Sequence, residues 1–217
     1  MAHGNAVRAI AFSPDGKLLA TAGEDHQVKV WNGETGAPID TGESLQLAGP
    51  AQAIRFVDEG RKLLVSSHDK SLRVWDVEQR KALTSDWRFG FTPIWLAVSP
   101  DERWVLVAGD GEYAEIRDIA TGYRIAPVLP HSKEIVGASV LDDGRRVALA
   151  SLDGVVKVLD LTTDQQGWPL HRVGAPIQSA GFADNERLIV VGGGDGQIAR
   201  LDPATLAPIA APIEQGD

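Results

Sequence analysis

Short segments that alternate apolar and polar residues run along the whole chain. In the first part of the sequence they are Val7 to Phe12, Lys17 to Thr21 and Gln27 to Trp31. Each is too short for a typical helix, and a period of two residues indicates a strand with one buried face. Turn-forming pairs such as Asp15-Gly16 separate the segments and tolerate the positive φ of tight hairpins. The pattern therefore predicts consecutive antiparallel strands.

The pattern recurs at a nearly fixed spacing. An acidic turn residue returns after 44, 41, 43 and 42 residues, at Asp25, Asp69, Asp110, Asp153 and Asp195. A polar residue that ends an apolar segment returns after 44, 42, 42 and 42 residues, at Asn32, Asp76, Asp118, Asp160 and Asp202. A fourth segment containing proline follows each copy, and proline belongs at a sheet edge because it has no N–H donor. Each copy is predicted to be a four-stranded antiparallel meander of about 42 residues, the size of one propeller blade.

Composition narrows the class of function. The 217 residues contain 21 Lys and Arg against 30 Asp and Glu, and the net charge of −9 disfavours nucleic acid as a partner. Cysteine is absent, which excludes disulfides, thiolate metal sites and cysteine nucleophiles. We find no apolar segment of the length that crosses a membrane and no secretory signal pattern in the first residues. We therefore expect a cytoplasmic protein with no membrane partner.

Several segments resemble repeats of the WD-repeat β-propeller family. The most specific are AFSPDG at 11–16, VKVW at 28–31, LRVWD at 72–76 and VKVLD at 156–160. The resemblance covers essentially the whole chain and implies an all-β fold: a β-propeller of five four-stranded antiparallel blades, forming one domain over 1–217. The expected blades are 3–47, 48–86, 87–129, 130–172 and 173–214. The family implies a ring of blades that serves as a rigid platform for protein partners.

Blades of this family often carry a hydrogen-bonded set of His, Ser or Thr, Asp and Trp. The resemblance implies such a structural tetrad at His3, Thr21, Asp25 and Trp31. Partial tetrads are expected at Ser66, Asp69 and Trp75 in the second copy and at His131 and Asp153 in the fourth, while the third keeps only the acid, Asp110. The set would satisfy buried polar groups, each of which costs about 1–3 kcal/mol when it is left unpaired.

The first tetrad also admits a catalytic interpretation, because His3, Asp25 and Thr21 supply a base, an acid and a hydroxyl group. The spacing follows the repeat, however, and we find no nucleophile-elbow or zinc-protease motif. The five histidines form no i, i+4 pair that suggests metal ligation. We therefore expect a non-enzymatic protein without catalytic residues, metal or cofactor.

Aromatic residues concentrate at one place in the chain. Six of the 13 lie between positions 87 and 113. The candidate partner-binding residues are Trp87, Arg88, Phe89, Phe91 and Trp95. Aromatic and Arg side chains are frequent at interface hot spots, but large apolar residues also fill the space between neighbouring blades. The sequence leaves both interpretations open.

Five copies without a spare strand leave three arrangements open: a five-bladed ring, a piece of a longer array, or assembly through open blade ends. We favour a fragment of a larger multidomain WD-repeat protein. The predicted function is a protein–protein interaction scaffold that binds a protein partner or flanking domains of its parent chain, with a homo-oligomer as a further option. The alternatives are a purely structural spacer array and, less favoured, a five-bladed propeller hydrolase acting on glycans. Val7 to Phe12 and Ile135 to Val140, both predicted inner strands, contain no carboxylate, which counts against the hydrolase.

Overall fold

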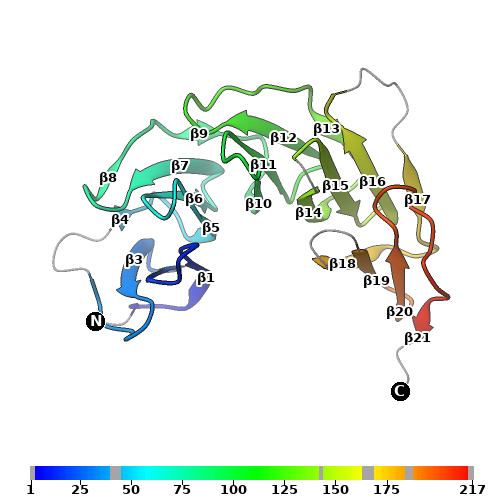
Figure 1. The fold of residues 1–217 in the computed structure, drawn as a ribbon, viewed down its shortest axis with the longest axis horizontal. Coiled ribbons are helices and arrows are strands. Elements are labelled where there is room, and N and C mark those ends of the chain that lie inside the picture. The colour runs from blue at the N-terminus through cyan, green and yellow to red at the C-terminus, as the bar shows by residue number, and fades with distance from the viewer. Residues whose placement is uncertain (1–2, 40–44, 142–143, 163–168, 184–187, 215–217) are drawn as a thin grey trace. The chain divides into compact units, whose positions relative to one another are not determined.

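The protein folds as a series of antiparallel sheets (Figure 1). The structure is a computed structural model that describes residues 3–39, 45–141, 144–162, 169–183 and 188–214. Within these ranges all regular elements are strands, and no helix is present that could cross a membrane. The prediction of an all-β fold with five antiparallel sheets is thereby confirmed. We call the sheets blades one to five in chain order.

The strands of the five blades follow one another without crossovers. Blade one contains β1 (Val7–Phe12), β2 (Leu18–Gly23), β3 (Gln27–Asn32) and β4 (Leu45–Gln46). Blade two contains β5 (Ala51–Val57), β6 (Lys62–Ser67), β7 (Ser71–Asp76), β8 (Lys81–Ala82) and β9 (Trp87–Arg88). Blade three contains β10 (Pro93–Val98), β11 (Trp104–Gly109), β12 (Tyr113–Asp118) and β13 (Leu129–Pro130). Blade four contains β14 (Ile135–Leu141), β15 (Arg146–Ser151), β16 (Val155–Asp160) and β17 (Leu170–Arg172), and blade five contains β18 (Ile177–Ala183), β19 (Leu188–Gly193), β20 (Gln197–Leu201) and β21 (Ile213–Glu214).

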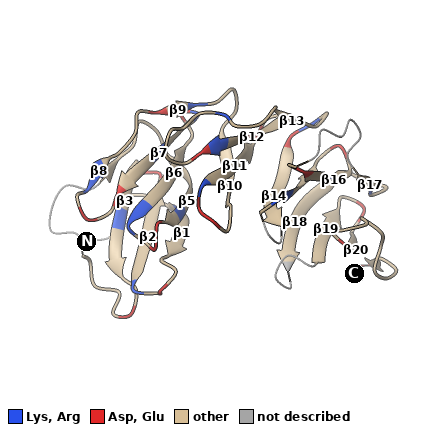
Figure 2. Ribbon diagram, turned by 45° about the horizontal axis from the view of Figure 1, so that its top comes forward, with Lys and Arg blue, Asp and Glu red and all other residues tan. Residues whose placement is uncertain are grey.

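The chain divides into two compact units. The first unit is Met1–Leu96 with Ile119–Gly122, and the second is Ala97–Asp118 with Tyr123–Asp217. Basic and acidic residues are distributed over strands and turns in both units (Figure 2). The single domain expected from the sequence stays a prediction, and so does closure into a ring.

The turn between the first two strands of blade one follows from its Ser-Pro-Asp-Gly sequence. In blade one, the Ser13 hydroxyl donates a hydrogen bond of 2.7 Å to Asp15 Oδ1 and accepts one of 2.9 Å from the Leu18 amide. Gly16 adopts a φ of 72°, a left-handed conformation that glycine reaches without steric cost. Ser99 and Asp101 repeat the first contact in blade three, at 2.6 Å. Short polar sequences therefore fix the hairpins locally.

The fourth strand of each blade is short. In blade one, β4 pairs with β3 only at Leu45 and Gln46, and Pro38 adds an isolated bridge to Trp31. The predicted proline-containing edge strands are therefore present but interrupted, because proline cannot donate to the ladder. Blade two differs, since both β8 and β9 pair with β7. The expected boundary between 86 and 87 is thus wrong: Trp87 and Arg88 complete blade two.

Each unit has its own apolar core between consecutive blades. In the first unit, Ile54, Phe56, Leu63 and Trp75 of blade two pack against small or branched residues of blade one, including Ala20. In the second unit, the corresponding core joins blades four and five and includes Leu141, Val156, Ile177, Ile189 and Leu201. Within each unit, consecutive blades therefore bury apolar side chains between them.

Candidate functional site

The four residues of the first predicted tetrad lie together in blade one. The His3 ring contacts both carboxylate oxygens of Asp25 through Nδ1, at 2.9 Å, and the Thr21 hydroxyl through Nε2, at 2.7 Å. The Trp31 indole Nε1–H donates a hydrogen bond of 2.8 Å to the same hydroxyl. With Nδ1 carrying the His3 proton, the bonds run in one direction from Trp31 through Thr21 and His3 to Asp25.

The backbone completes the surroundings of Asp25. The amides of Gly4 and Gln27 donate hydrogen bonds of 2.8 Å and 3.2 Å to its carboxylate. Burial works to raise the pKa of Asp25, but the hydrogen bonds from His3, Gly4 and Gln27 outweigh it and lower this pKa below its ordinary value. Thr21 Oγ1 makes hydrogen bonds with both His3 and Trp31, so the geometry is that of a structural cross-link between strands and turn.

Blade four keeps half of this arrangement. His131 Nδ1 contacts Asp153 at 3.1 Å, and both the amide and the hydroxyl of Ser132 donate to the same carboxylate oxygen. In the register of the sheet, Leu149 and Leu159 take the positions that Thr21 and Trp31 have in blade one. His131 Nε2 is consequently buried without a hydrogen-bond partner among the described residues.

Both ionisable groups of this half tetrad are shifted. Burial lowers the pKa of His131, and this effect exceeds the opposing influence of Asp153. Burial also works to raise the pKa of Asp153, but the hydrogen bonds from Ser132 and His131 lower it to about 2. The pair is therefore held as a neutral imidazole beside a carboxylate at neutral pH.

The partial tetrad expected in blade two does not form as predicted. The Ser66 hydroxyl donates to the carbonyl oxygen of Pro93, at 2.8 Å, and accepts from the amide of Ala53, at 3.0 Å. Ser66 aligns with Ala22 in the register, and the residue that aligns with Thr21 is Val65. Trp75 Nε1 is therefore buried without a partner among the described residues. The prediction that Ser66 serves Trp75 was wrong by one position, which places its side chain on the other face of the strand.

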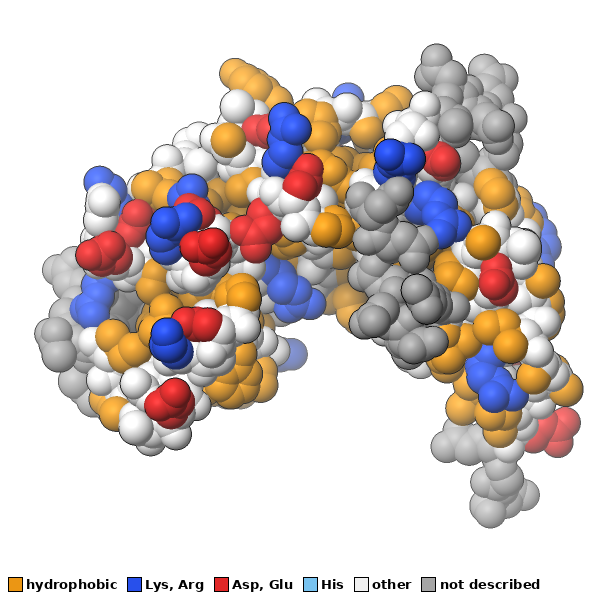
Figure 3. Space-filling view, in the orientation of Figure 1, with side chains coloured by type: hydrophobic (Ala, Val, Ile, Leu, Met, Phe, Trp, Pro, Cys, Tyr) orange, Lys and Arg blue, Asp and Glu red, His pale blue; other side chains and the backbone are white. Residues whose placement is uncertain are grey.

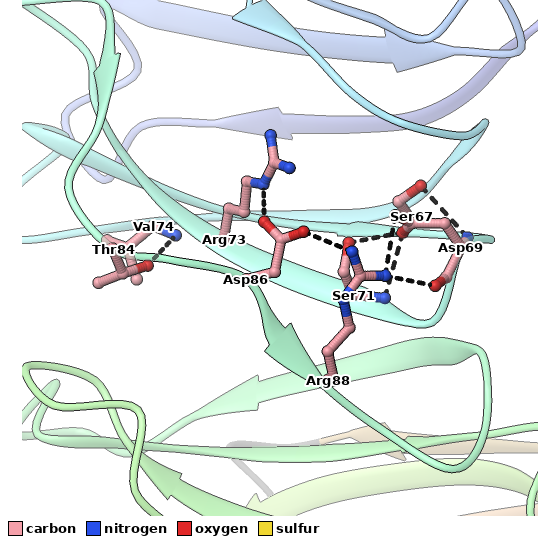
Figure 4. Close-up of polar contacts among 8 residues, drawn as sticks. All are labelled: Ser67, Asp69, Ser71, Arg73, Val74, Thr84, Asp86 and Arg88. Atoms are coloured by element: carbon pink, nitrogen blue, oxygen red, sulfur yellow. Dashed lines mark hydrogen bonds and ion pairs between the residues drawn. The ribbon is translucent and has the colours of Figure 1, made fainter.

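Asp69 instead joins an ionic network that sequence reasoning missed (Figure 4). Arg88 on β9 contacts Asp69 Oδ2 at 3.2 Å and Asp86 Oδ2 at 2.6 Å. Arg73 on β7 pairs with the other oxygen of Asp86, and its hydrogen bond is the main reason that the pKa of Asp86 is lowered. These ion pairs hold β9, and Asp86 just before it, against β7 and the Asp69 turn. Charges two positions apart at 86 and 88 were the available signal, because alternate residues of a strand share a face.

The third copy also departs from the prediction. Tyr113 begins β12 as Gln27 begins β3, so Gly111, two residues before it, aligns with Asp25. Asp110 lies one position too early to take the tetrad role. In the same alignment Phe89 takes the position of His3: its amide donates to the Lys70 carbonyl as that of His131 donates to the Glu112 carbonyl. In blade three, Phe89 and Gly111 therefore stand where blade one has the polar tetrad residues His3 and Asp25.

The predicted aromatic partner site is mostly interior. Trp87, Phe89 and Phe91 are only 6%, 8% and 2% exposed, and Trp95 is partly buried. The rings of Phe89 and Phe91 pack at 5.5 Å between centroids. Arg88 is exposed but holds the two carboxylates described above. Trp87 and Arg88 belong to β9 of blade two, and the interpretation of the cluster as an exposed binding surface is wrong for the three buried rings.

A different apolar surface is exposed on blade one. Phe12 pairs with Leu19 and Leu19 with Trp31, so the three side chains form a row across one face of the sheet. Phe56, Leu63 and Trp75 form the same row in blade two, where it is buried against blade one. Phe12 is 57% exposed and its neighbour Ile10 is 62% exposed, whereas Phe56 is 8% exposed. Figure 3 shows hydrophobic side chains between charged ones on the surface that it presents.

The described ranges hold no group of three or more His, Asp or Glu side chains arranged to bind a metal ion. Comparison with known proteins gives a family match in blades one and two and a short match to one curated protein. Residues 1–32 and 46–76 match the family model "WD domain, G-beta repeat". A stretch of 39 residues is 49% identical to Protein Mut11 of Chlamydomonas reinhardtii, and it spans 18% of this chain and 10% of that protein. Residues 1–32 and 46–76 are therefore similar to WD repeats, and the five successive meander sheets are consistent with a propeller of this kind.

Proposed function

We propose that this chain is a non-enzymatic protein–protein interaction scaffold within a larger cytoplasmic WD-repeat protein. WD repeats in general mediate protein–protein interactions and are not catalysts. The residues that could have formed a catalytic triad support this proposal. His3, Thr21 and Asp25 form hydrogen bonds with one another, and Asp25 also accepts one from the backbone. The groups that an active site would expose are used to hold strands together.

The observation that carries the proposal is the row of Phe12, Leu19 and Trp31 on blade one, in which Phe12 is exposed and Leu19 and Trp31 are partly exposed. A contiguous apolar surface on a protein marks an interaction site more often than an accident of folding. The equivalent row of blade two is covered by a neighbouring blade, since Phe56 and Trp75 pack against blade one. The surface of that blade offers small side chains at the contact, among them Ala9, Ala11 and Ala20. The partner is therefore a protein surface with small apolar residues that admits the Phe12 ring.

The experiment places a photo-crosslinking phenylalanine analogue at position 12 of the full chain in cells that express it. We expect a crosslinked protein partner at position 12, identified by mass spectrometry. The matched control carries the analogue at Tyr123, which is 76% exposed but lies outside the row. A second variant, Leu19→Asp with the analogue at position 12, is expected to lose the product because it places a charge in the middle of the contact.

Equal crosslinking from positions 12 and 123 would contradict the proposal, because the row would then be no more than an exposed surface. The absence of any crosslinked protein at position 12, with the folded chain verified by its circular dichroism spectrum, would contradict it as well.

A further inference from the structure

The first unit contains a cavity of about 420 Å³ between blades one and two. Its walls are aliphatic, and its mouth is charged. The wall residues are Leu18, Val28, Val30, Leu45 and Val77, and Ile39 lies at the rim with 38% of its surface exposed. The charged residues are Glu59, Arg61, Glu78 and Arg80, which belong to turns of blade two. Pockets of this size and apolar character bind ligands in many proteins.

The repeat shows what fills the corresponding space one blade later. Leu45 pairs with Val28 in blade one, and Trp87 pairs with Leu72 in blade two, so Leu45 and Trp87 are equivalent. Trp87 is 6% exposed, and its indole lies directly against Gly122 in the next turn. An indole therefore occupies this position at the second junction, whereas the equivalent residue at the first is a leucine that lines the cavity.

The turn residue beside the cavity also differs between the two junctions. Arg80 and Gly122 are 42 positions apart and both have a positive φ, 55° and 74°, so Arg80 takes the place of the glycine beside the cavity. Its guanidinium donates a hydrogen bond of 3.0 Å to the Ile39 carbonyl at the rim. A cation beside an apolar cavity is electrostatically complementary to the face of an aromatic ring. The unit already contains such a pair, in which Arg73 lies 5.9 Å from the centre of the Trp75 ring.

We propose that this cavity binds an aromatic side chain presented by a protein partner, with the ring between the Leu45 and Val77 walls and beside Arg80. The proposal deepens the interaction function proposed above and names the chemistry of one contact. An aliphatic side chain would fill part of the volume without using the charge of Arg80, so the site distinguishes the two classes.

The direct test uses N-acetyl-tryptophanamide and N-acetyl-leucinamide as probes, followed by the methyl NMR signals of Val28, Val30, Leu45 and Val77. We expect saturable shifts of these signals with the tryptophan probe. Its affinity should exceed that of the leucine probe about tenfold, which corresponds to about 1.4 kcal/mol. Equal shifts with both probes, or no shift with the tryptophan probe, would overturn the proposal.

The matched variants copy into the first junction the two residues that fill the equivalent space at the second. Leu45→Trp combined with Arg80→Gly should fill the cavity as Trp87 and Gly122 do, abolish probe binding and leave the urea midpoint at or above that of the wild type. Leu45→Met, which conserves volume, should retain binding. Probe binding unchanged in the filled variant would overturn the assignment of the cavity. Position 12 does not line this cavity. Failure of the probes to bind would therefore not affect the interpretation of the crosslink, and failure of the crosslink would not affect that of probe binding.

Discussion

Val65 in blade two takes the sheet position of Thr21 in blade one, and the indole N–H of Trp75 is therefore buried without an acceptor among the described residues. The two blades share the Phe, Leu and Trp row but differ in what satisfies the indole. Blade one uses a directed chain of hydrogen bonds, whereas blade two relies on apolar contacts and on Arg73 beside the ring. The repeat thus tolerates loss of the polar set where packing compensates.

Replacing Thr21 by Val should destabilise blade one. The variant keeps the side-chain volume but removes the bonding partner of both His3 Nε2 and Trp31 Nε1. We expect the free energy of unfolding to fall by about 1–3 kcal/mol, measured by urea denaturation. Thr21→Ser keeps a hydroxyl and should retain most of the stability. Equal stability of the Val variant and the wild type would show that the set contributes nothing.

Asp25→Ala tests the same set from its other end. The change leaves the amides of Gly4 and Gln27 and the ring of His3 without their carboxylate. We expect a lower melting temperature, measured by calorimetry. An unchanged melting curve would indicate that the hydrogen bonds around Asp25 are not formed in solution.

Two glycines with the same backbone conformation should respond differently to alanine. Gly36 and Gly122 have φ values of 68° and 74°, but a Cβ on Gly36 meets nothing within 4 Å, whereas one on Gly122 overlaps the Trp87 indole. Gly36→Ala should therefore cost about 1 kcal/mol, from backbone conformation alone. Gly122→Ala should cost a further 1–3 kcal/mol, approximately the cost of overpacking. Similar urea midpoints for the two variants would contradict the described packing of Trp87.

The ionic network of Figure 4 predicts a salt-dependent stability. Asp86 lies between two arginines and is mostly buried, so Asp86→Asn should destabilise more than Arg88→Gln. Arg88 is largely exposed, and its loss should cost less than about 1 kcal/mol. Urea denaturation at low and high salt should show the difference between wild type and Asp86→Asn decreasing as salt screens the charges. A difference that grows with salt would contradict an electrostatic role.

The His131–Asp153 pair predicts acid sensitivity of blade four. The pKa of His131 is lowered, so the folded state disfavours its protonation and loses stability as the pH falls below the ordinary value of 6.5. The pKa of Asp153 is lowered from 3.8 to about 2, so its contribution is complete above 3.8 and is lost as the pH falls toward 2. With solvent screening this second contribution amounts to about 1–2 kcal/mol.

The first of these effects is measurable by calorimetry between pH 7 and pH 5. His131→Phe, which places at 131 the residue that the chain uses at 89, should have a shallower dependence of melting temperature on pH than the wild type. His68→Gln, at an exposed position, serves as the control and should keep the wild-type slope. Identical slopes for all three proteins would contradict the assignment to His131.

The architecture could be predicted because it depends on local and periodic signals. Alternating segments and the Ser-Pro-Asp-Gly turn define strands and hairpins, and the Asp25 turn recurs with the repeat. The complete tetrad at His3 could be located through the resemblance to WD repeats. Its copies could be located only in part. His131 and Asp153 form the expected contact, whereas Ser66 lies one residue after the position of Thr21, on the other face of the strand, and Asp110 lies one residue before the position of Asp25 in its turn. The register shift at Val7/Ala9 recurs at Ala51/Ala53, so the spacing of 44 residues between the first two copies leads from Thr21 to Val65 and not to Ser66.

Burial was the second quantity that the sequence left open. Trp87 and Phe12 are both large aromatic residues near strand ends, yet one is buried and the other is exposed. The difference arises from which blade lies against each face, and that is a property of tertiary packing. The two matching rows, Phe12, Leu19, Trp31 and Phe56, Leu63, Trp75, were visible as a repeat. Only the structure distinguishes the covered row from the open one.

The most direct test of the account is the solution mass of the purified chain, measured by light scattering over a range of concentrations. The open row of blade one should drive association, so we expect a mass that rises above the 23.2 kDa of the single chain with concentration. Ile10→Asp combined with Phe12→Asp should return the mass to 23.2 kDa without loss of fold. A wild-type mass of 23.2 kDa at every concentration, indistinguishable from that of the variant, would contradict the claim that this face drives association.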